Sequence, residues 1–209
     1  MVKRPAISAI VLCGGRSSRM GHDKASLPFG DETLLDRVLR LVATVADDVV
    51  LAAAPAQPVP AGVRVSRDAT TGVGPLPALV AALHVVNGPR TVVVACDLPL
   101  LRADVLALLI DESEGWDGAV PLVDGRRVPT CGAYQTAALR HAGERFGDPR
   151  HRSLRDFIAL LRLREVPASV LETVDPQLSS FTPCNTPEEY RRAQVLAGLK
   201  VNGPASGAV

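Results

Sequence analysis

The sequence lacks an excess of charge of either sign. It contains 23 lysine and arginine residues against 22 aspartate and glutamate residues, which gives a formal net charge of +1. A nearly neutral protein has no long-range field that draws it to nucleic acid or to an anionic membrane. We therefore expect neither partner, and any anion that binds must be held by a local site.

Long hydrophobic runs and closely spaced cysteines are also absent. No apolar stretch approaches the roughly 18 residues of a transmembrane helix, and the apolar run near the start is too short for a signal peptide. The cysteines form no CxxC pair, which argues against a structural zinc site or a redox dithiol. We expect a cytoplasmic protein with free, buried thiols; a reactive or metal-binding thiol is the alternative. The four cysteines are Cys13, Cys96, Cys131 and Cys184.

Aromatic residues are scarce as well. They make up 3% of the 209 residues, whereas 47% are hydrophobic, so alanine, valine and leucine must fill the core. The length suits one domain and is short for two. We expect a single domain over residues 1–199 and a small, polar, disordered tail over residues 200–209.

The first half of the chain alternates between two kinds of apolar pattern. Short β-branched runs without polar alternation, typical of strands buried on both faces, predict strands at residues 7–12, 49–53, 63–66 and 91–95. Between them, residues 34–45 and 76–86 have apolar side chains at helical spacing. The alternation predicts an α/β fold: a single Rossmann-like three-layer domain with a mostly parallel sheet, whose ligands gather at the carboxyl ends of the strands.

The second half is less regular. A strand at 118–123, a turn at Asp124 and Gly125, and a strand at 128–134 predict a hairpin. The last helix is expected after the sequence NTP, capped by Asn185 or Thr186, with Pro187 in its first turn. Other helices are predicted at 103–110, 136–145 and 153–161, and other strands at 163–166 and 170–174.

The stretch LCGGRSSRMGHDK, residues 12–24, follows the first predicted strand directly. Gly14 and Gly15 allow the backbone to approach an anion and to turn N–H groups toward it, and cationic side chains follow. The spacing differs from a Walker A loop, and Arg19 stands where G-x-G-x-x-G needs its last glycine. The loop therefore predicts a phosphate site of another kind.

These residues resemble the L-x-G-G-x-S-x-R-M-G-x-D-K signature of nucleotidyltransferases, most closely that of the molybdenum cofactor guanylyltransferases. The sequences GPLPALVAAL, ACDLPLL and NTPEEY resemble three further motifs of the family, in the same order. The resemblance covers roughly residues 6–197. It implies a fold of the nucleotide-diphospho-sugar transferase type and the transfer of GMP from GTP to the terminal phosphate of molybdopterin, with release of pyrophosphate.

The resemblance also implies roles for particular residues. Asp97 is implied as the ligand of Mg²⁺, with a helix-capping carboxylate as the alternative, and Arg19 and Lys24 as the residues that hold the β- and γ-phosphates. No nucleophile or general base is expected, because a phosphate acceptor is already ionised. Further nucleotide contacts are implied for Leu12, Cys13, Gly14, Gly15, Asp68, Gly74, Pro75 and Leu76.

Base and acceptor are less well defined by the motifs. The family's asparagine at the end of the second strand is replaced by Ala52, so cytidylyl transfer, or transfer to another phosphorylated acceptor, stays open beside the guanylyl reading. A nucleotide-binding carrier without turnover is the alternative of a different class. Transient contacts with proteins that make or receive the cofactor, and a monomer or weak oligomer, are expected. The candidate acceptor contacts are Arg126, Arg127, Pro129, Thr130, Asn185 and the run 150–152.

Overall fold

The apolar runs of the sequence form the centre of one mixed sheet in the computed structural model, which describes residues 6–13, 24–55, 57–67, 75–149 and 153–201. The strand order is β10-β7-β9-β6-β1-β4-β5, with β8 paired to β7. Only β8 and β9 run antiparallel to the others in the part of the sheet described, so the predicted mostly parallel sheet is confirmed. The strands are β1 (Ile7–Cys13), β4 (Asp48–Ala53), β5 (Arg64–Arg67), β6 (Arg90–Ala95), β7 (Gly118–Val123), β8 (Arg126–Arg127), β9 (Cys131–Gln135) and β10 (Leu163–Pro167).

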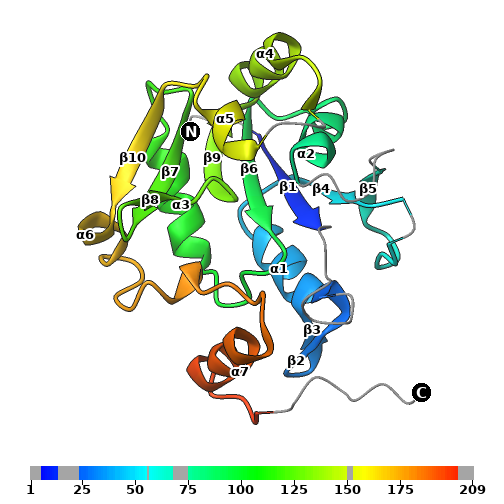
Figure 1. Ribbon diagram of the computed structural model, residues 1–209, viewed down its shortest axis with the longest axis vertical. Helices are drawn as coiled ribbons and strands as arrows, with labels where there is room; N and C mark the ends of the chain where they lie inside the picture. The colour runs from blue at the N-terminus through cyan, green and yellow to red at the C-terminus, as the bar shows by residue number, and fades with distance from the viewer. Residues whose placement is uncertain (1–5, 14–23, 56, 68–74, 150–152, 202–209) are drawn as a thin grey trace.

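Helices cover both faces of this sheet, as Figure 1 shows. Alternate residues of β1 point to opposite sides: Ala9 and Val11 pack with α1 and α3, whereas Ile10 and Leu12 pack with α2, α4 and α5. All of β1 is buried, which explains its continuous apolar run. The predicted three layers are thus present. The helices are α1 (Leu34–Val42), α2 (Pro75–Leu83), α3 (Ala103–Glu112), α4 (Thr136–Phe146), α5 (Leu154–Ile158), α6 (Ala168–Leu171) and α7 (Pro187–Leu196).

A smaller apolar cluster joins α7 to the two-stranded hairpin of β2 (Pro28–Phe29) and β3 (Glu32–Thr33). The Tyr190 hydroxyl donates to the Pro28 carbonyl oxygen, and the Phe29 and Tyr190 rings meet edge to face with centroids 6.4 Å apart. In Figure 1 this unit lies beyond the arrowheads of β1 and β6. It therefore stands at the carboxyl edge of the sheet, where ligands of such folds bind.

Two expectations from the sequence need correction. The predicted strand at 170–174 is wrong, because α6 ends within this range. The next residues form a turn, in which backbone hydrogen bonds join near neighbours, such as Asp175 N to Leu171 O at 2.9 Å. The predicted strand at 128–134 begins later, at Cys131 of β9, because Cys131 N donates to Val128 O and the chain turns over residues 128–130; the strand that pairs with β7 across the Asp124–Gly125 turn is the short β8.

Other local predictions are confirmed. Asp124 and Gly125 form the hairpin turn with positive φ angles of 49° and 68°, as a two-residue loop requires. Thr186 caps α7, and Pro187 is its first residue. Among the described residues, no helix has both the length and the apolar character that a membrane crossing needs. Of the tail, only Lys200 and Val201 are described, so its predicted disorder stays a prediction.

Candidate functional site

The ends of β1 and β6 bring the first candidate residues together. Leu12 and Cys13 finish β1, and the Cys96 N–H, just past β6, donates to the Leu12 carbonyl oxygen at 3.0 Å. Asp97 follows immediately at the same edge. Lys24 is the first residue of a short 3-10 helix, Lys24–Ser26, which packs against α1. Gly14, Gly15, Arg19, Asp68 and Gly74, with His22 and 150–152, lie outside the described residues.

Lys24 and Asn185 are in direct contact although 161 positions separate them. The Lys24 Nζ atom donates to the Asn185 Oδ1 atom at 2.5 Å, in a partly buried position. The neighbouring Cys184 N–H donates to the Asp97 carbonyl oxygen at 2.9 Å. One predicted phosphate-binding residue, one predicted metal ligand and one predicted acceptor contact therefore meet at the carboxyl edge of the sheet.

The Asp97 carboxyl has a perturbed titration. Burial raises its pKa, the Lys24 ammonium lowers it, and the Glu189 carboxylate raises it again, so that the net direction is upward. A carboxylate whose charge is poorly compensated by the protein gains from a bound cation. This is the electrostatic setting that a metal ligand needs.

The start of α7 supplies the rest of this edge. Glu189 Oε2 accepts hydrogen bonds from Thr186 N at 3.0 Å and from Asn185 N at 2.6 Å, and Glu189 N donates to Thr186 Oγ1 at 3.2 Å. The two bonds between Thr186 and Glu189 satisfy N–H groups at the helix start. The bond from Asn185 N fixes the backbone of Asn185, the residue that holds Lys24. Sequence reasoning missed Glu189 as a residue of this edge.

A loop beyond β4 was also missed. Arg67 Nη1 donates to the carbonyl oxygens of Ala54, Pro55 and Gln57 at 2.8, 2.9 and 3.2 Å, so one guanidinium fixes the loop that follows β4. Gln57 Nε2 contacts Cys13 Sγ at 2.8 Å, which ties that loop to the end of β1. In the sequence, the only sign of this contact was the position of Arg67 at the end of a predicted strand, next to the candidate nucleotide-binding residue Asp68.

Several nucleotide candidates can act only through their backbones. Leu12, Leu76 and Ala52 have buried side chains within the apolar layer under α2, with exposed fractions of 5%, 1% and 0%. Pro75 begins α2 and is half-buried. Cys13 is buried in the opposite layer. Ala52 therefore offers no polar side-chain atom to a base.

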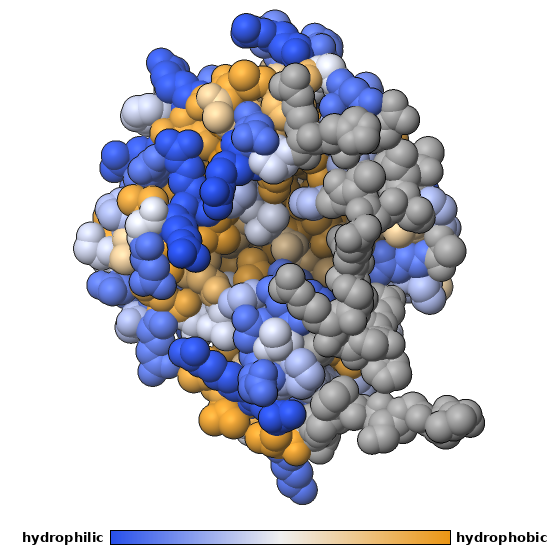
Figure 2. Space-filling model, in the orientation of Figure 1, coloured by the Kyte–Doolittle hydropathy of each residue, from blue (hydrophilic) through white to orange (hydrophobic). Residues whose placement is uncertain are grey.

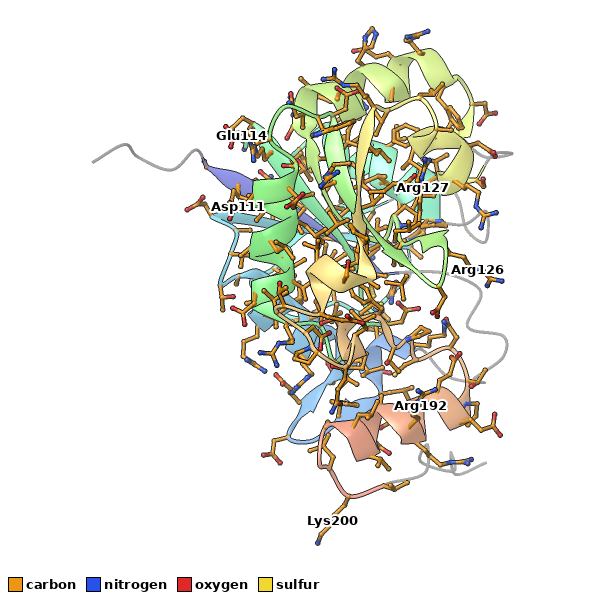
Figure 3. The ribbon with its side chains drawn as sticks, turned by 90° about the vertical axis from the view of Figure 1, so that its left-hand side faces the viewer. Asp111, Glu114, Arg126, Arg127, Arg192 and Lys200 are labelled. Carbon is orange, nitrogen blue, oxygen red and sulfur yellow. The ribbon has the colours of Figure 1, made fainter. Side chains whose placement is uncertain are left out.

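The acceptor candidates do not all meet. The Thr130 carbonyl oxygen accepts from Ala95 N at 2.8 Å, which places Thr130 beside the end of β6. Arg127 is instead exposed and paired with Glu165 of β10, with Nε to Oε1 at 2.7 Å. Figure 3 shows Arg126 and Arg127 on the outer hairpin, with Arg126 directed away from the protein. The structure thus keeps Thr130 and Asn185 near the site and separates Arg127 from it.

The donor set at this edge suits a magnesium ion held largely by its substrate. No group of three or more histidine, cysteine, aspartate or glutamate side chains gathers within the described ranges. Mg²⁺ typically takes one or two protein carboxylates and completes its shell with phosphate oxygens and water. Asp97 alone can serve that role. In Figure 2 the face turned toward the viewer is hollowed near its middle, above α7, and apolar side chains form the floor of this hollow.

All four cysteines are free and buried, as predicted. Burial raises the pKa of the Cys184 thiol to about 12, and nearby carboxylates add to the shift. Burial also raises the pKa of the Cys131 thiol to about 12. Neither thiol is a nucleophile at neutral pH.

Solved structures reproduce the same fold. Molybdopterin-guanine dinucleotide biosynthesis protein A from Archaeoglobus fulgidus has a TM-score of 0.76 at 24% identity, covering 92% of this chain and 98% of that one. 2-C-methyl-D-erythritol 4-phosphate cytidylyltransferase from Thermus thermophilus has a TM-score of 0.70 at 20% identity, covering 93% and 100%. Both belong to the nucleotide-diphospho-sugar transferase fold.

Sequence comparison identifies the family. A protein from Pelotomaculum thermopropionicum named "Probable molybdenum cofactor guanylyltransferase" is 30% identical over 191 residues, which are 91% of this chain and 93% of that protein. The model of the MobA-like NTP transferase domain matches residues 9–166. That range holds β1 from Ala9 onward, the Asp97 turn and the strands between them, and it covers more than half of the chain, so the chain belongs to the family of MobA-like NTP transferases.

Proposed function

We propose that this protein transfers GMP from GTP to the terminal phosphate of molybdopterin and releases pyrophosphate. The observation that carries the proposal is the meeting of Lys24, Asp97 and Asn185 at one edge of the sheet. These residues come from three distant segments, each matching a motif of the guanylyltransferases. The names of the curated relatives, at 30% identity over most of the chain, support the same substrate pair.

The reaction forms one bond and breaks one. An oxygen of the acceptor phosphate attacks the α-phosphorus of GTP, and the bond from that phosphorus to the bridging oxygen breaks, so pyrophosphate leaves with the electron pair. No proton must be removed from the acceptor, because its phosphate is ionised at neutral pH. The work left to the protein is to align the two substrates and to neutralise charge.

Lys24 is the described cation best placed for the leaving group. Its ammonium donates to the Asn185 amide oxygen, and because an ammonium has three N–H donors it can also form charge-assisted bonds to phosphate oxygens while that contact stays in place. Arg19 is proposed to share this role. Asn185 is proposed to contact the acceptor through its side-chain NH₂ group, while its oxygen keeps the bond from Lys24.

Asp97 is proposed to hold the Mg²⁺ ion, which would neutralise charge on the phosphate oxygens and act as a Lewis acid there. The raised pKa of Asp97 supports this role, because a cation relieves the cost of its buried charge. Gly14, Gly15, Asp68 and Gly74 are proposed to bind the nucleotide as their motifs imply. Free thiols and the substrate GTP are consistent with a cytoplasmic location.

Cytidylyl transfer is the competing proposal, and two observations favour keeping it. Ala52 supplies no side-chain contact to a base, and the fold is shared with a cytidylyltransferase. Guanine selection must then come from backbone groups or from the loop that Arg67 fixes. Binding of nucleotides decides between the two.

The test is calorimetric titration of the protein with non-hydrolysable analogues of GTP, CTP, ATP and UTP in Mg²⁺, followed by pyrophosphate release with molybdopterin. We expect preference for GTP and release only when molybdopterin is present. Preference for CTP would move the protein to cytidylyl transfer. Nucleotide binding without release on any phosphorylated acceptor would make it a carrier.

A further inference from the structure

We propose that Glu189 is a positioning residue that fixes Asn185, and through Asn185 the Lys24 ammonium, in the geometry that nucleotidyl transfer uses; the inference rests on the proposed function. Glu189 has no role in the mechanism above. Its carboxylate nevertheless makes the shortest of the bonds at the start of α7, the 2.6 Å contact from Asn185 N.

A capping box explains only part of what Glu189 does. In that motif the carboxylate accepts from the N–H of the cap itself, here Thr186, at 3.0 Å. The bond to Asn185 N reaches one residue further back and is shorter. It adds nothing that a helix start requires, because Asn185 precedes the cap. Its consequence is that the backbone of Asn185 cannot turn independently of α7.

The fixed backbone directs the Asn185 side chain at Lys24. Asn185 Oδ1 accepts from Lys24 Nζ at 2.5 Å, and on the other side Cys184 N donates to the Asp97 carbonyl oxygen at 2.9 Å. The segment 184–186 therefore spans from the metal-ligand turn to the helix cap, with Lys24 attached between them. A lysine side chain has four flexible bonds, so an external contact is needed to hold its ammonium in one place.

The negative charge of Glu189 is unfavourable for the proposed binding of a triphosphate, so helix capping alone does not explain a glutamate here. A carboxylate close to Asp97 adds negative charge where a triphosphate is proposed to bind, and like charges there weaken binding. Glutamine at this position would cap the helix with the same acceptor oxygen. In the structure, one oxygen of the Glu189 carboxylate accepts hydrogen bonds from two backbone N–H groups, those of Asn185 and Thr186. Positioning is the function that uses these bonds.

The first experiment measures Lys24 directly and needs neither substrate. Lysine acylation by limiting N-hydroxysuccinimide acetate is followed residue by residue with mass spectrometry, with the exposed Lys200 as internal reference. Glu189→Ala should raise the rate at Lys24 relative to Lys200 by roughly three-fold or more, as should Asn185→Ala. The double variant should react no faster than either single variant, because both act on one contact.

The second experiment measures pyrophosphate release. Glu189→Ala should lower kcat on the order of 10-fold with little change in the KM for GTP, because a misplaced charge is felt mainly in the transition state. Glu189→Gln should retain most of kcat, since its amide oxygen still accepts both bonds. Glu188→Ala is the matched control: Glu188 is the exposed neighbour, in the same helix turn, and its loss should leave kcat unchanged.

Three results would overturn the inference. They are an unchanged Lys24 acylation rate in Glu189→Ala, equal losses of kcat in Glu188→Ala and Glu189→Ala, or a Glu189→Gln variant as impaired as Glu189→Ala. Thermal unfolding of each variant shows whether the substitution has unfolded α7. If Glu189→Ala has done so, the comparison of Glu189→Gln with wild type decides the test. If acylation behaves as expected and no pyrophosphate is released from any substrate pair, the proposed function fails and the positioning stands.

Discussion

The Lys24 ammonium acts on the Asp97 carboxyl in the opposite direction to burial, and burial prevails. The ammonium lowers the pKa of Asp97 and desolvation raises it more, so the ionised carboxylate costs more free energy in the folded protein than in water. Functional charges commonly reduce stability in this way. The relationship gives two separable predictions for Asp97.

The first prediction concerns stability. A carboxyl whose pKa is raised by folding destabilises the folded state above that pKa, and the penalty disappears as pH falls below the unfolded value. Asp97→Asn should therefore raise Tm at pH 7 in a chelator, by about 2–4 °C for each kcal/mol in a domain of this size. The gain should shrink toward pH 4. A Tm lowered at pH 7 would show that the attraction to Lys24 prevails instead.

The second prediction concerns turnover. Asp97→Asn should abolish pyrophosphate release at saturating Mg²⁺, because the amide cannot supply the negative charge that a metal ligand needs. Asp104→Asn is the control, since Asp104 is an exposed carboxylate paired with Arg102 on the surface. Circular dichroism checks that both variants fold. Wild-type activity in Asp97→Asn would remove Asp97 from the metal site.

Lys24 is predicted to act mainly in the transition state. Lys24→Ala should lower kcat on the order of 10²-fold, because charge accumulates on the departing pyrophosphate that the ammonium stabilises. Steady-state kinetics separates kcat from KM, and Lys200→Ala should behave as wild type because Lys200 is exposed. An effect confined to KM for GTP would instead mean that Lys24 binds substrate and transition state equally.

The sequence predicts the sheet and its edge well because their causes are local. The apolar runs of β1 and β6 require burial on both faces, and the ends of these two strands define where the glycine loop and Asp97 follow, respectively. Thr186 and Pro187 similarly define the start of α7 from neighbouring residues. The resemblance to the family then assigned Lys24, Asp97 and Asn185 to one site, and these three do meet.

The contacts that the sequence does not predict are those between distant segments. Nothing local signals that Asn185 contacts Lys24, or that Arg67 binds three carbonyl groups beyond β4. Arg127 illustrates the same point. The resemblance made it a candidate acceptor contact, and the structure pairs its guanidinium with Glu165 of β10. Such partners depend on packing that pattern and composition do not contain.

The cysteines give a prediction about reactivity. Because burial raises the pKa of both Cys131 and Cys184 to about 12, only about one thiol in 10⁴ is ionised at pH 8. In the native protein both should resist iodoacetamide, and both should react once the chain is unfolded in urea. Mass spectrometry of the labelled peptides measures this. Cys184→Ala should retain activity, and its loss in a folded variant would give the thiol a functional role.

Two glycines test the packing of the sheet against that of a helix. A Cβ on Gly118 of β7 would lie 2.8 Å from the Ala133 carbonyl oxygen and 2.6 Å from Tyr134 Cδ1, so the adjoining strand must shift to admit it. Gly118→Ala should therefore cost roughly 1–3 kcal/mol of the free energy of unfolding.

Gly143, inside α4, is the matched control, because the nearest atom to a Cβ added there would be Val80 Cγ1 at 4.0 Å. Gly143→Ala should add about 0.5–1 kcal/mol by restricting the unfolded chain. Urea unfolding at 25 °C measures both, and a Gly118→Ala variant as stable as Gly143→Ala would mean that β7 and β9 pair more loosely than their register indicates.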